Sequence, residues 1–344
     1  MRRRRWLLAA LALAICLTAC GDKSTGAQSE GQKKVQDAPK ESVSELPIEV
    51  EGADYPLVIR DYIKQETELK EMPKKVAVLS GTPLNIWYDL GGKSICTSDI
   101  SSNVRLVEGY EDEIKALPTI GPVYSIDMES VIPLKPDLVI AQTGTQSVQG
   151  KKLKEMGFPT IMTHIRSLED VISYYRGFGK ILGKEELAEQ KIRELTQKKE
   201  EIVSKLPKER PSVVILYFTN KTIAAKLDRS IAGDVAKILG FENIAADLPA
   251  DSLGSENTPL DVEYIVKKDP DYVFVTSMVE SNELAEEMIR KEFETNPVWK
   301  GVRAIQEGKV HHLPQEYFLY NAGPYYDEAI RTMARCVYPE VFGE

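Results

Sequence analysis

Hydrophobic residues recur along this chain in two patterns, as short runs rich in Val and Ile and as longer stretches with helical spacing. Each short run has the length of a strand, and most are followed by a helical pattern. This alternation is typical of βα units and largely parallel sheets. The predicted strands are 76–81, 94–97, 137–141, 160–163, 212–219, 272–276 and one that ends at 311–314. The predicted helices are 84–90, 230–239, one that follows the strand at 272–276 and ends near 294, and 324–336, and residues 55–69 suggest an opening hairpin.

The longest helical pattern runs from Lys184 to Leu206 and contains neither Gly nor Pro. Its apolar positions form a stripe at helical spacing, and Pro207 ends it. Twenty-three residues in a helix reach roughly 34 Å, about the diameter of a small domain. Taken alone, the stretch could be an ordinary surface helix of one domain.

The segments on the two sides of this helix resemble each other. Residues 126–142 (IDMESVIPLKPDLVIAQ) align without a gap with residues 260–276 (LDVEYIVKKDPDYVFVT) at an offset of 134. Each copy reads as a short helix, a Pro-Asp turn and a buried strand, with the Asp placed to accept from backbone donors. The repeat predicts an α/β fold of two Rossmann-like lobes joined by one long rigid helix, although helix, Pro-Asp and strand is also a common α/β sequence. The shared pairs include Asp127/Asp261, Glu129/Glu263, Pro136/Pro270 and Asp137/Asp271.

The N-terminal residues are predicted to form a signal peptide. Four Arg at positions 2–5 precede an apolar run at 6–17, which is too short to span a bilayer. The run ends in Leu-Thr-Ala-Cys-Gly, which resembles the lipobox of bacterial lipoproteins and implies acylation, palmitate included, at Cys20. An ordinary secretory signal is the alternative. The predicted division is a signal peptide at 1–19, a lipidated Cys and flexible tether at 20–50, an N-terminal lobe at 51–183, the interlobe helix at 184–206 and a C-terminal lobe at 207–344.

Composition and charge describe an acidic, globular protein. Of the 344 residues 42% are hydrophobic and 28% charged. Removal of 1–19 takes away four Arg and no acid, so the formal net charge falls from −9 to −13. Such a balance argues against nucleic acid or anionic lipid as a partner. Cys96 and Cys336 could pair outside the cytoplasm or remain two buried thiols.

No catalytic motif emerges from the sequence. It lacks a Gly-rich dinucleotide or phosphate loop after a strand, and it lacks a nucleophile elbow. The three His are His164, His311 and His312, without the spacing of a zinc hydrolase. His311 and His312 would lie on opposite faces of a strand, one packed and one solvated. We predict no catalytic residue, no metal site and no resident cofactor, so a metal would arrive already held by an organic chelate.

Ligands of α/β proteins bind at the carboxyl ends of strands and between lobes. Aromatic side chains near these ends suit a flat or bulky ligand, and cations suit its anionic groups. The candidate residues of such a cleft are Thr82, Trp87, Tyr88, Tyr124, Gln142, Thr143, Tyr217, Lys226, Arg229, Tyr317 and Tyr320.

The order of these motifs resembles a known family. A lipobox, a tether, "PKKVAVLS", "GPVYSIDMESVIPLKPDLVIA", a long helix, "LDVEYIVKKDPDYVFV" and "NPVWKGVRAIQEGKVHHLP" are similar to the substrate-binding lipoproteins of ABC importers for ferric siderophores, haem and cobalamin. The resemblance covers residues 55 to 344. It implies a class III periplasmic-binding-protein-like fold whose two lobes hold one chelate.

The resemblance also implies a function and partners. Glu129 and Glu263 would dock on Arg residues of the permease dimer. The protein would be a monomer, without enzyme activity, anchored through Cys20 to the outer face of a bacterial cytoplasmic membrane. We expect it to capture a ferric siderophore or related chelate, with haem or cobalamin as the alternative. An extracytoplasmic α/β enzyme and a surface scaffold are the rivals from other classes.

Overall fold

The computed structural model describes residues 46–100, 104–319 and 323–343. The predicted signal peptide, Cys20 and most of the predicted tether lie outside this range, and so does Tyr320. Residues Ser44–Glu344 form one compact unit. Among the helices of the described residues, none combines the length and apolar character needed to cross a membrane.

The described chain opens with a small antiparallel sheet in the order β1-β2-β3, built from β1 (Glu49–Glu51), β2 (Leu57–Arg60) and β3 (Glu66–Leu69). The predicted hairpin over 55–69 is therefore confirmed. The predicted tether, however, extends too far. Ile48 is buried in the main hydrophobic core and β1 pairs with β2, so residues 48–50 belong to the folded part.

A parallel sheet follows in the order β4-β5-β6, formed by β4 (Val76–Val78), β5 (Leu138–Gln142) and β6 (Thr160–Thr163). The predicted strand at 94–97 is wrong, since only Thr97 forms an isolated bridge there. The Ser94 hydroxyl donates to Cys96 O and accepts from Val78 N. A side chain therefore makes hydrogen bonds beside β4, where the prediction expected those of a further strand. The accompanying helices are α1 (Gly81–Asp89), α2 (Glu111–Lys115), α3 (Met128–Val131), η1 (Ile132–Leu134), α4 (Ser147–Glu155) and α5 (Leu168–Leu182).

The second half of the chain forms a six-stranded sheet in the order β10-β8-β7-β11-β12, with β9 paired to β7. Strands β9 and β11 pair in parallel with β7, and β12 pairs in parallel with β11. Strand β8 pairs antiparallel with β7, and β10 pairs antiparallel with β8. The strands are β7 (Ser212–Thr219), β8 (Ile223–Lys226), β9 (Glu242–Asn243), β10 (Asn257–Pro259), β11 (Tyr272–Met278) and β12 (Val310–His312). The helices are α7 (Ile231–Ile238), α8 (Val262–Lys268), α9 (Asn282–Thr295), η2 (Pro297–Gly301), α10 (Arg303–Gln306), α11 (Gln315–Phe318), α12 (Tyr326–Val337) and α13 (Pro339–Phe342).

The two copies of the sequence repeat form similar structures, a helical segment capped by Asp and followed by a strand. Asp127 caps α3 by accepting from Glu129 N, and Asp261 caps α8 by accepting from Tyr264 N, each at 2.9 Å. The two helical segments end in left-handed residues at the same offset, Lys135 (φ 49°) and Asp269 (φ 44°).

The acid of each Pro-Asp turn binds backbone donors as predicted. Asp137 accepts from Lys74 N and Lys75 N just before β4, and Asp271 accepts from Ser212 N at the start of β7. Each turn thereby ties a repeat strand to its neighbour in the sheet.

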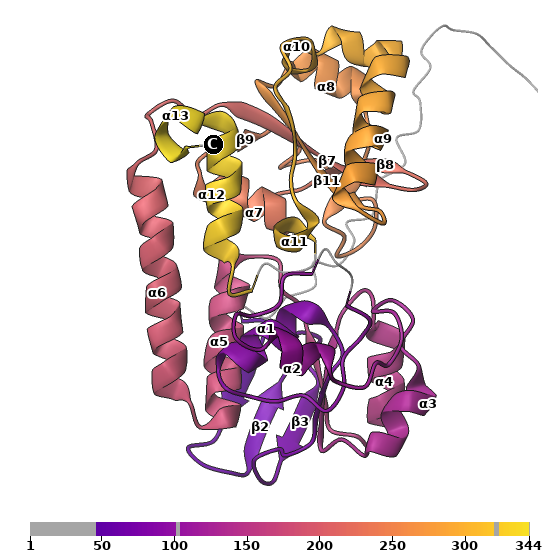
Figure 1. Ribbon diagram of the computed structural model, residues 1–344, viewed down its shortest axis with the longest axis vertical. Coiled ribbons are helices and arrows are strands. Elements are labelled where there is room, and N and C mark those ends of the chain that lie inside the picture. The colour runs from indigo at the N-terminus through magenta and orange to yellow at the C-terminus, as the bar shows by residue number, and fades with distance from the viewer. Residues whose placement is uncertain (1–45, 101–103, 320–322, 344) are drawn as a thin grey trace, which may run out of the picture. The chain divides into compact units, whose positions relative to one another are not determined.

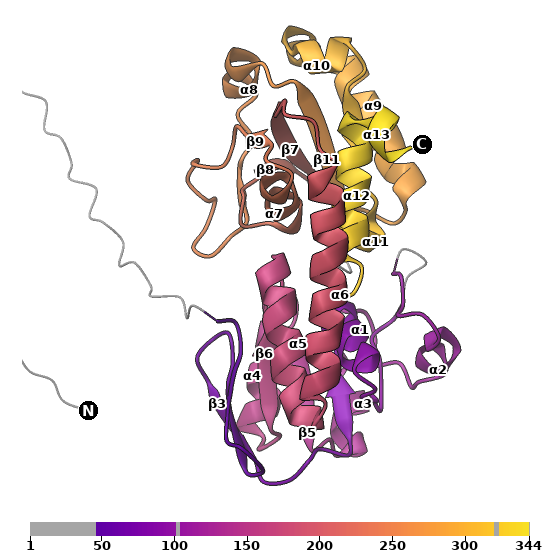
Figure 2. The same cartoon turned by 90° about the vertical axis from the view of Figure 1, so that its left-hand side faces the viewer.

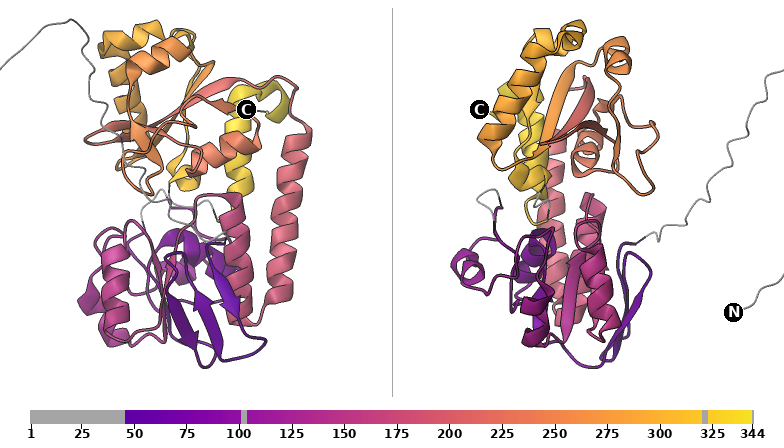
Figure 3. Two further views of the ribbon diagram at one scale, coloured as in Figure 1. Left: turned by 180° about the vertical axis from the view of Figure 1, so that it is seen from behind. Right: turned by 90° about the vertical axis from the view of Figure 1, so that its right-hand side faces the viewer.

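The predicted long helix is α6 (Glu185–Ser204), which packs on α5 and on α12 (Figures 1 and 2). Its buried stripe belongs to a core that also contains residues of β4, β7, α5 and α12. Lys191 pairs with Asp89 at 2.7 Å and Lys198 with Asp327 at 3.2 Å, so α6 is held to elements on both sides of it in sequence. Figure 3 shows the same neighbours from behind. The lobe boundaries at 51–183 and 207–344 stay a prediction.

Candidate functional site

Polar side chains are joined to one another at the carboxyl ends of the first parallel sheet. Ser80, which follows β4, donates from Oγ to Gln142 Oε1 at the end of β5. The next residue, Thr143, shares a hydrogen bond of 2.6 Å with His164 Nδ1, which follows β6. The His164 ring stacks on Tyr62 with centroids 4.0 Å apart. Parallel strands bring these groups together because their carboxyl ends meet at one edge.

His164 is held in its neutral form. Burial, with a smaller contribution from the Arg166 charge, lowers the pKa of His164 from 6.5 to about 3. The ring therefore stays uncharged at neutral pH, able to pack against an aromatic face and to form hydrogen bonds without carrying a charge. The sequence offered His164 only as one of three His, with no role attached.

This lowered pKa predicts an acid-sensitive stability. Above pH 6.5 the His164 ring is neutral in both the folded and the unfolded protein. Below pH 6.5 the ring binds a proton in the unfolded chain but stays neutral in the folded protein. Stability is therefore lost as the pH falls from 6.5 toward 3, by about 1.4 kcal/mol for each unit of separation. We expect the free energy of unfolding, measured in urea, to fall between pH 6.5 and 4.5 by about 2 kcal/mol more in the native protein than in a His164→Phe variant. Equal losses in both proteins would contradict the neutral assignment.

A second group of side chains gathers on the six-stranded sheet. The Lys226 ammonium lies 4.2 Å from the centroid of the Tyr217 ring, and the Tyr217 hydroxyl contacts Met278 Sδ at 3.1 Å. Lys226 also donates to Glu256 Oε1 at 2.6 Å. Tyr217 and Lys226 are thus two predicted candidates that the fold brings into contact.

Two sets of contacts join segments that precede α6 to segments that follow it. Arg105 donates to the Tyr317 hydroxyl at 2.8 Å and lies 4.1 Å above the Tyr325 ring. Arg166 donates to Gly254 O at 3.0 Å. Tyr317 was predicted, whereas the two Arg were missed.

The two missed Arg differ in how far the sequence signalled them. Arg166 follows β6 closely, so the rule of strand carboxyl ends could have found it. Arg105 lies in an irregular segment with no such signal.

Trp87 and Tyr88 were wrong as ligand contacts. Trp87 is 1% exposed, packs edge-on against Phe178 and donates from its indole nitrogen to Lys93 O. The Tyr88 hydroxyl accepts from Ser94 N, and its side chain is fully buried. Both lie in the later turns of α1, which pack into the core. Thr82, in the first turn of the same helix, is also buried.

The remaining candidates are spread out. Tyr124 is 68% exposed and Arg229 is exposed. Both residues of the His pair are half-buried, where one packed and one solvated ring were expected. His311 lies 6.0 Å from the Tyr272 ring, His312 is hydrogen bonded to Ser277, and burial lowers the pKa of both.

The two cysteines in the part of the chain that the structure describes are free. Cys96 is buried and Cys336 is half-buried. Burial raises the pKa of Cys96 to about 12 and that of Cys336 to about 11, so both remain thiols at neutral pH.

The two acids predicted to dock on a permease are exposed and equivalent. Glu129 lies in the first turn of α3 and Glu263 in the first turn of α8. Neither forms an ion pair with any residue that the structure describes. Acids at these positions also complement the helix dipoles, by about 0.3–1 kcal/mol each.

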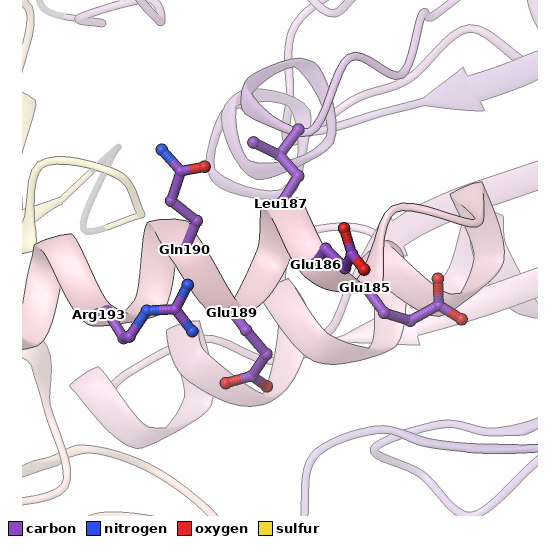
Figure 4. A pocket seen from close by; sticks show the side chains of 6 residues that line it. All are labelled: Glu185, Glu186, Leu187, Glu189, Gln190 and Arg193. Carbon is purple, nitrogen blue, oxygen red and sulfur yellow. The ribbon is translucent and has the colours of Figure 1, made fainter.

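A surface hollow of 660 Å³ lies elsewhere, against α6 (Figure 4). Its lining consists of Glu185, Glu186, Leu187, Glu189, Gln190 and Arg193. Glu189 forms an exposed ion pair with Arg176 at 2.7 Å. Because the lining comes from one helix, far in sequence from any strand end, we do not assign this hollow to the ligand site. Across the described ranges, no group of three or more His, Cys, Asp or Glu is placed to hold a metal ion.

The chain belongs to the periplasmic binding protein family, whose model matches residues 76–317, more than half of the sequence. It is 24% identical over 355 residues, covering the whole of both chains, to the uncharacterized ABC transporter substrate-binding lipoprotein YvrC of Bacillus subtilis. It is 27% identical over 263 residues to the Fe(3+)-citrate-binding protein YfmC of the same species, covering 73% of this chain and 76% of that one.

Solved structures show the same fold. The crystal structure of Staphylococcus aureus IsdE complexed with heme matches with a TM-score of 0.66 at 21% identity, covering 77% of this chain and all of that chain. The predicted α/β fold of the class III periplasmic binding proteins is therefore confirmed.

Proposed function

We propose that this chain captures a ferric siderophore or a related metal chelate outside the cytoplasm and delivers it to an ABC permease. The observation that carries the proposal is the contact between segments from the two sides of α6, through Arg105 with Tyr317 and through Arg166 with Gly254, in a member of the periplasmic binding protein family. The kinship with a relative named for ferric citrate supports an iron chelate as the ligand.

The chemistry of the site suits a flat or bulky ligand with anionic groups. Tyr62, Tyr217 and Tyr317 offer aromatic faces. Arg166 and Lys226 offer cations that can meet carboxylates or other anionic donors of a chelate. Haem is the second candidate, favoured by the likeness to a protein whose structure contains heme.

We further propose where the protein is anchored and which residues contact the permease. Cys20 would carry the lipid that anchors the protein, and two or more acyl chains bind a membrane firmly because each buried methylene contributes about 0.8 kcal/mol. Glu129 and Glu263 would dock on the permease dimer, and one monomer would carry one chelate without a resident cofactor.

Calorimetric titration of the purified protein tests the proposal. The probes are ferric citrate, ferrioxamine B, haemin and cyanocobalamin, each beside its metal-free form where one exists. We expect one chelate to bind at a 1:1 ratio with a Kd below about 1 μM, equivalent to a binding free energy of about 8 kcal/mol. A scaffold or an enzyme for another substrate would bind none of the four.

A further inference from the structure

The carboxylate of Glu256 lies between two cations that come from opposite sides of α6 in sequence. Its Oε1 accepts from Lys226 Nζ at 2.6 Å, and its Oε2 lies 3.8 Å from Arg166 Nε. The Lys226 side chain is 7% exposed, whereas that of Glu256 is 30% exposed. Two cations therefore share one carboxylate, and the buried cation depends on it.

The same cluster holds hydrogen-bonding capacity that the described residues do not use. An Arg has five N–H donors, and Arg166 uses one of them, toward Gly254 O. Its 3.8 Å separation from Glu256 is too long for a hydrogen bond. Asn257 stands opposite Lys226 in the ladder, and its buried Oδ1 has no partner among the described residues. Donors and an acceptor thus remain available to a bound molecule.

We propose that Glu256 occupies the position of a ligand carboxylate and is displaced from Lys226 and Arg166 when the ligand binds. This inference rests on the proposed function and names its substrate class, a metal chelate that carries a free carboxylate. The carboxylates of ferric citrate and the propionates of haem share this chemistry. A hydroxamate chelate without a carboxylate has no group for the position.

The difference in burial between Glu256 and Lys226 determines which of the two side chains moves when a ligand binds. Glu256 is partly exposed and lies between the exposed segment 251–254 and β10, so it can turn toward water. Lys226 cannot follow it, and a buried charge left without a partner is strongly unfavourable. Only an incoming anion can release Glu256, so the pair selects against neutral ligands.

Two substitutions with opposite expected effects test the exchange. Glu256→Gln removes the competing carboxylate, and we expect it to tighten the binding of ferric citrate or haemin about tenfold. Arg166→Gln removes one cation and keeps the Lys226–Glu256 pair, and we expect it to weaken the same binding about tenfold. Ferrioxamine B, which lacks a carboxylate, should change less than about twofold in either variant. Calorimetry with the three chelates separates a citrate carboxylate from a haem propionate.

The exposed Glu287→Gln on α9 is the matched control. If Glu256→Gln binds ferric citrate and haemin no more tightly than the native protein, the proposal that Glu256 occupies the position of a ligand carboxylate is overturned. If Glu256→Gln does not melt cooperatively, the test rests on Arg166→Gln alone. An unchanged affinity of Arg166→Gln for ferric citrate and haemin then overturns the inference. Failure of the native protein to bind any chelate is a different result, because it overturns the proposed function itself.

Discussion

Replacing Glu129 and Glu263 together by lysine is expected to abolish uptake of the chelate while leaving its affinity for the purified protein unchanged. Both acids are exposed and stand at equivalent positions of the repeat, in the first turns of α3 and α8. Charge reversal would set lysines against the Arg residues expected on the permease, and like charges across an interface cost several kcal/mol. We expect uptake of iron-55 chelate to fall at least about 100-fold, since each 1.4 kcal/mol is a factor of ten.

The control is a second charge reversal away from these helices, Glu71→Lys with Glu287→Lys. Both acids are exposed and form no ion pair with described residues. This variant has the same net charge as the docking variant and should transport normally. Uptake that survives in the Glu129/Glu263 variant would show the docking assignment to be wrong. Loss of binding together with uptake would place the acids in the ligand site.

Replacing Leu195 by proline should remove most of the stability of the protein. Leu195 is buried at the middle of α6, in the core shared with β4, β7, α5 and α12. Proline in a helix interior costs about 3 kcal/mol or more, and the loss of a buried Leu adds about 2–5 kcal/mol. The sum approaches the 5–15 kcal/mol by which domains are usually stable.

Urea unfolding followed by circular dichroism measures this loss, with Leu195→Met as the control that conserves volume and should cost less than about 1.5 kcal/mol. Any folded fraction of the proline variant should also transport poorly, because we propose that α6 sets the spacing between Glu129 and Glu263. A proline variant with the unfolding midpoint of the native protein would contradict the structural role of α6. A folded variant with normal uptake would contradict its role as a spacer.

The sequence predicted those parts of the fold that depend on local periodicity. The bounds of β6 and β7 agree with the predicted strands, and α6 differs by one or two residues at each end. The offset of 134 also anticipated the equivalent turns at Lys135 and Asp269. The repeated acids also have a similar role, because Asp137 and Asp271 each accept from backbone N–H at the beginning of the neighbouring strand.

The candidate site was harder to predict, because contacts between distant segments decide it. Trp87 and Tyr88 follow a strand end closely, yet the helix turns them into the core. Arg105 meets Tyr317 across 212 positions of the sequence, and no local pattern records such a pairing. No sequence pattern distinguishes Glu256 from the other acids of the chain, and only the structure shows its hydrogen bond to the buried Lys226.

The central claim, that the protein binds a metal chelate, is tested most directly by calorimetric titration of residues 44–344 with ferric citrate, ferrioxamine B, haemin and cyanocobalamin. We predict one chelate bound per chain with a Kd below about 1 μM, and at least about tenfold weaker binding of the metal-free form where one exists. The absence of binding by all four at concentrations of about 100 μM would contradict the claim.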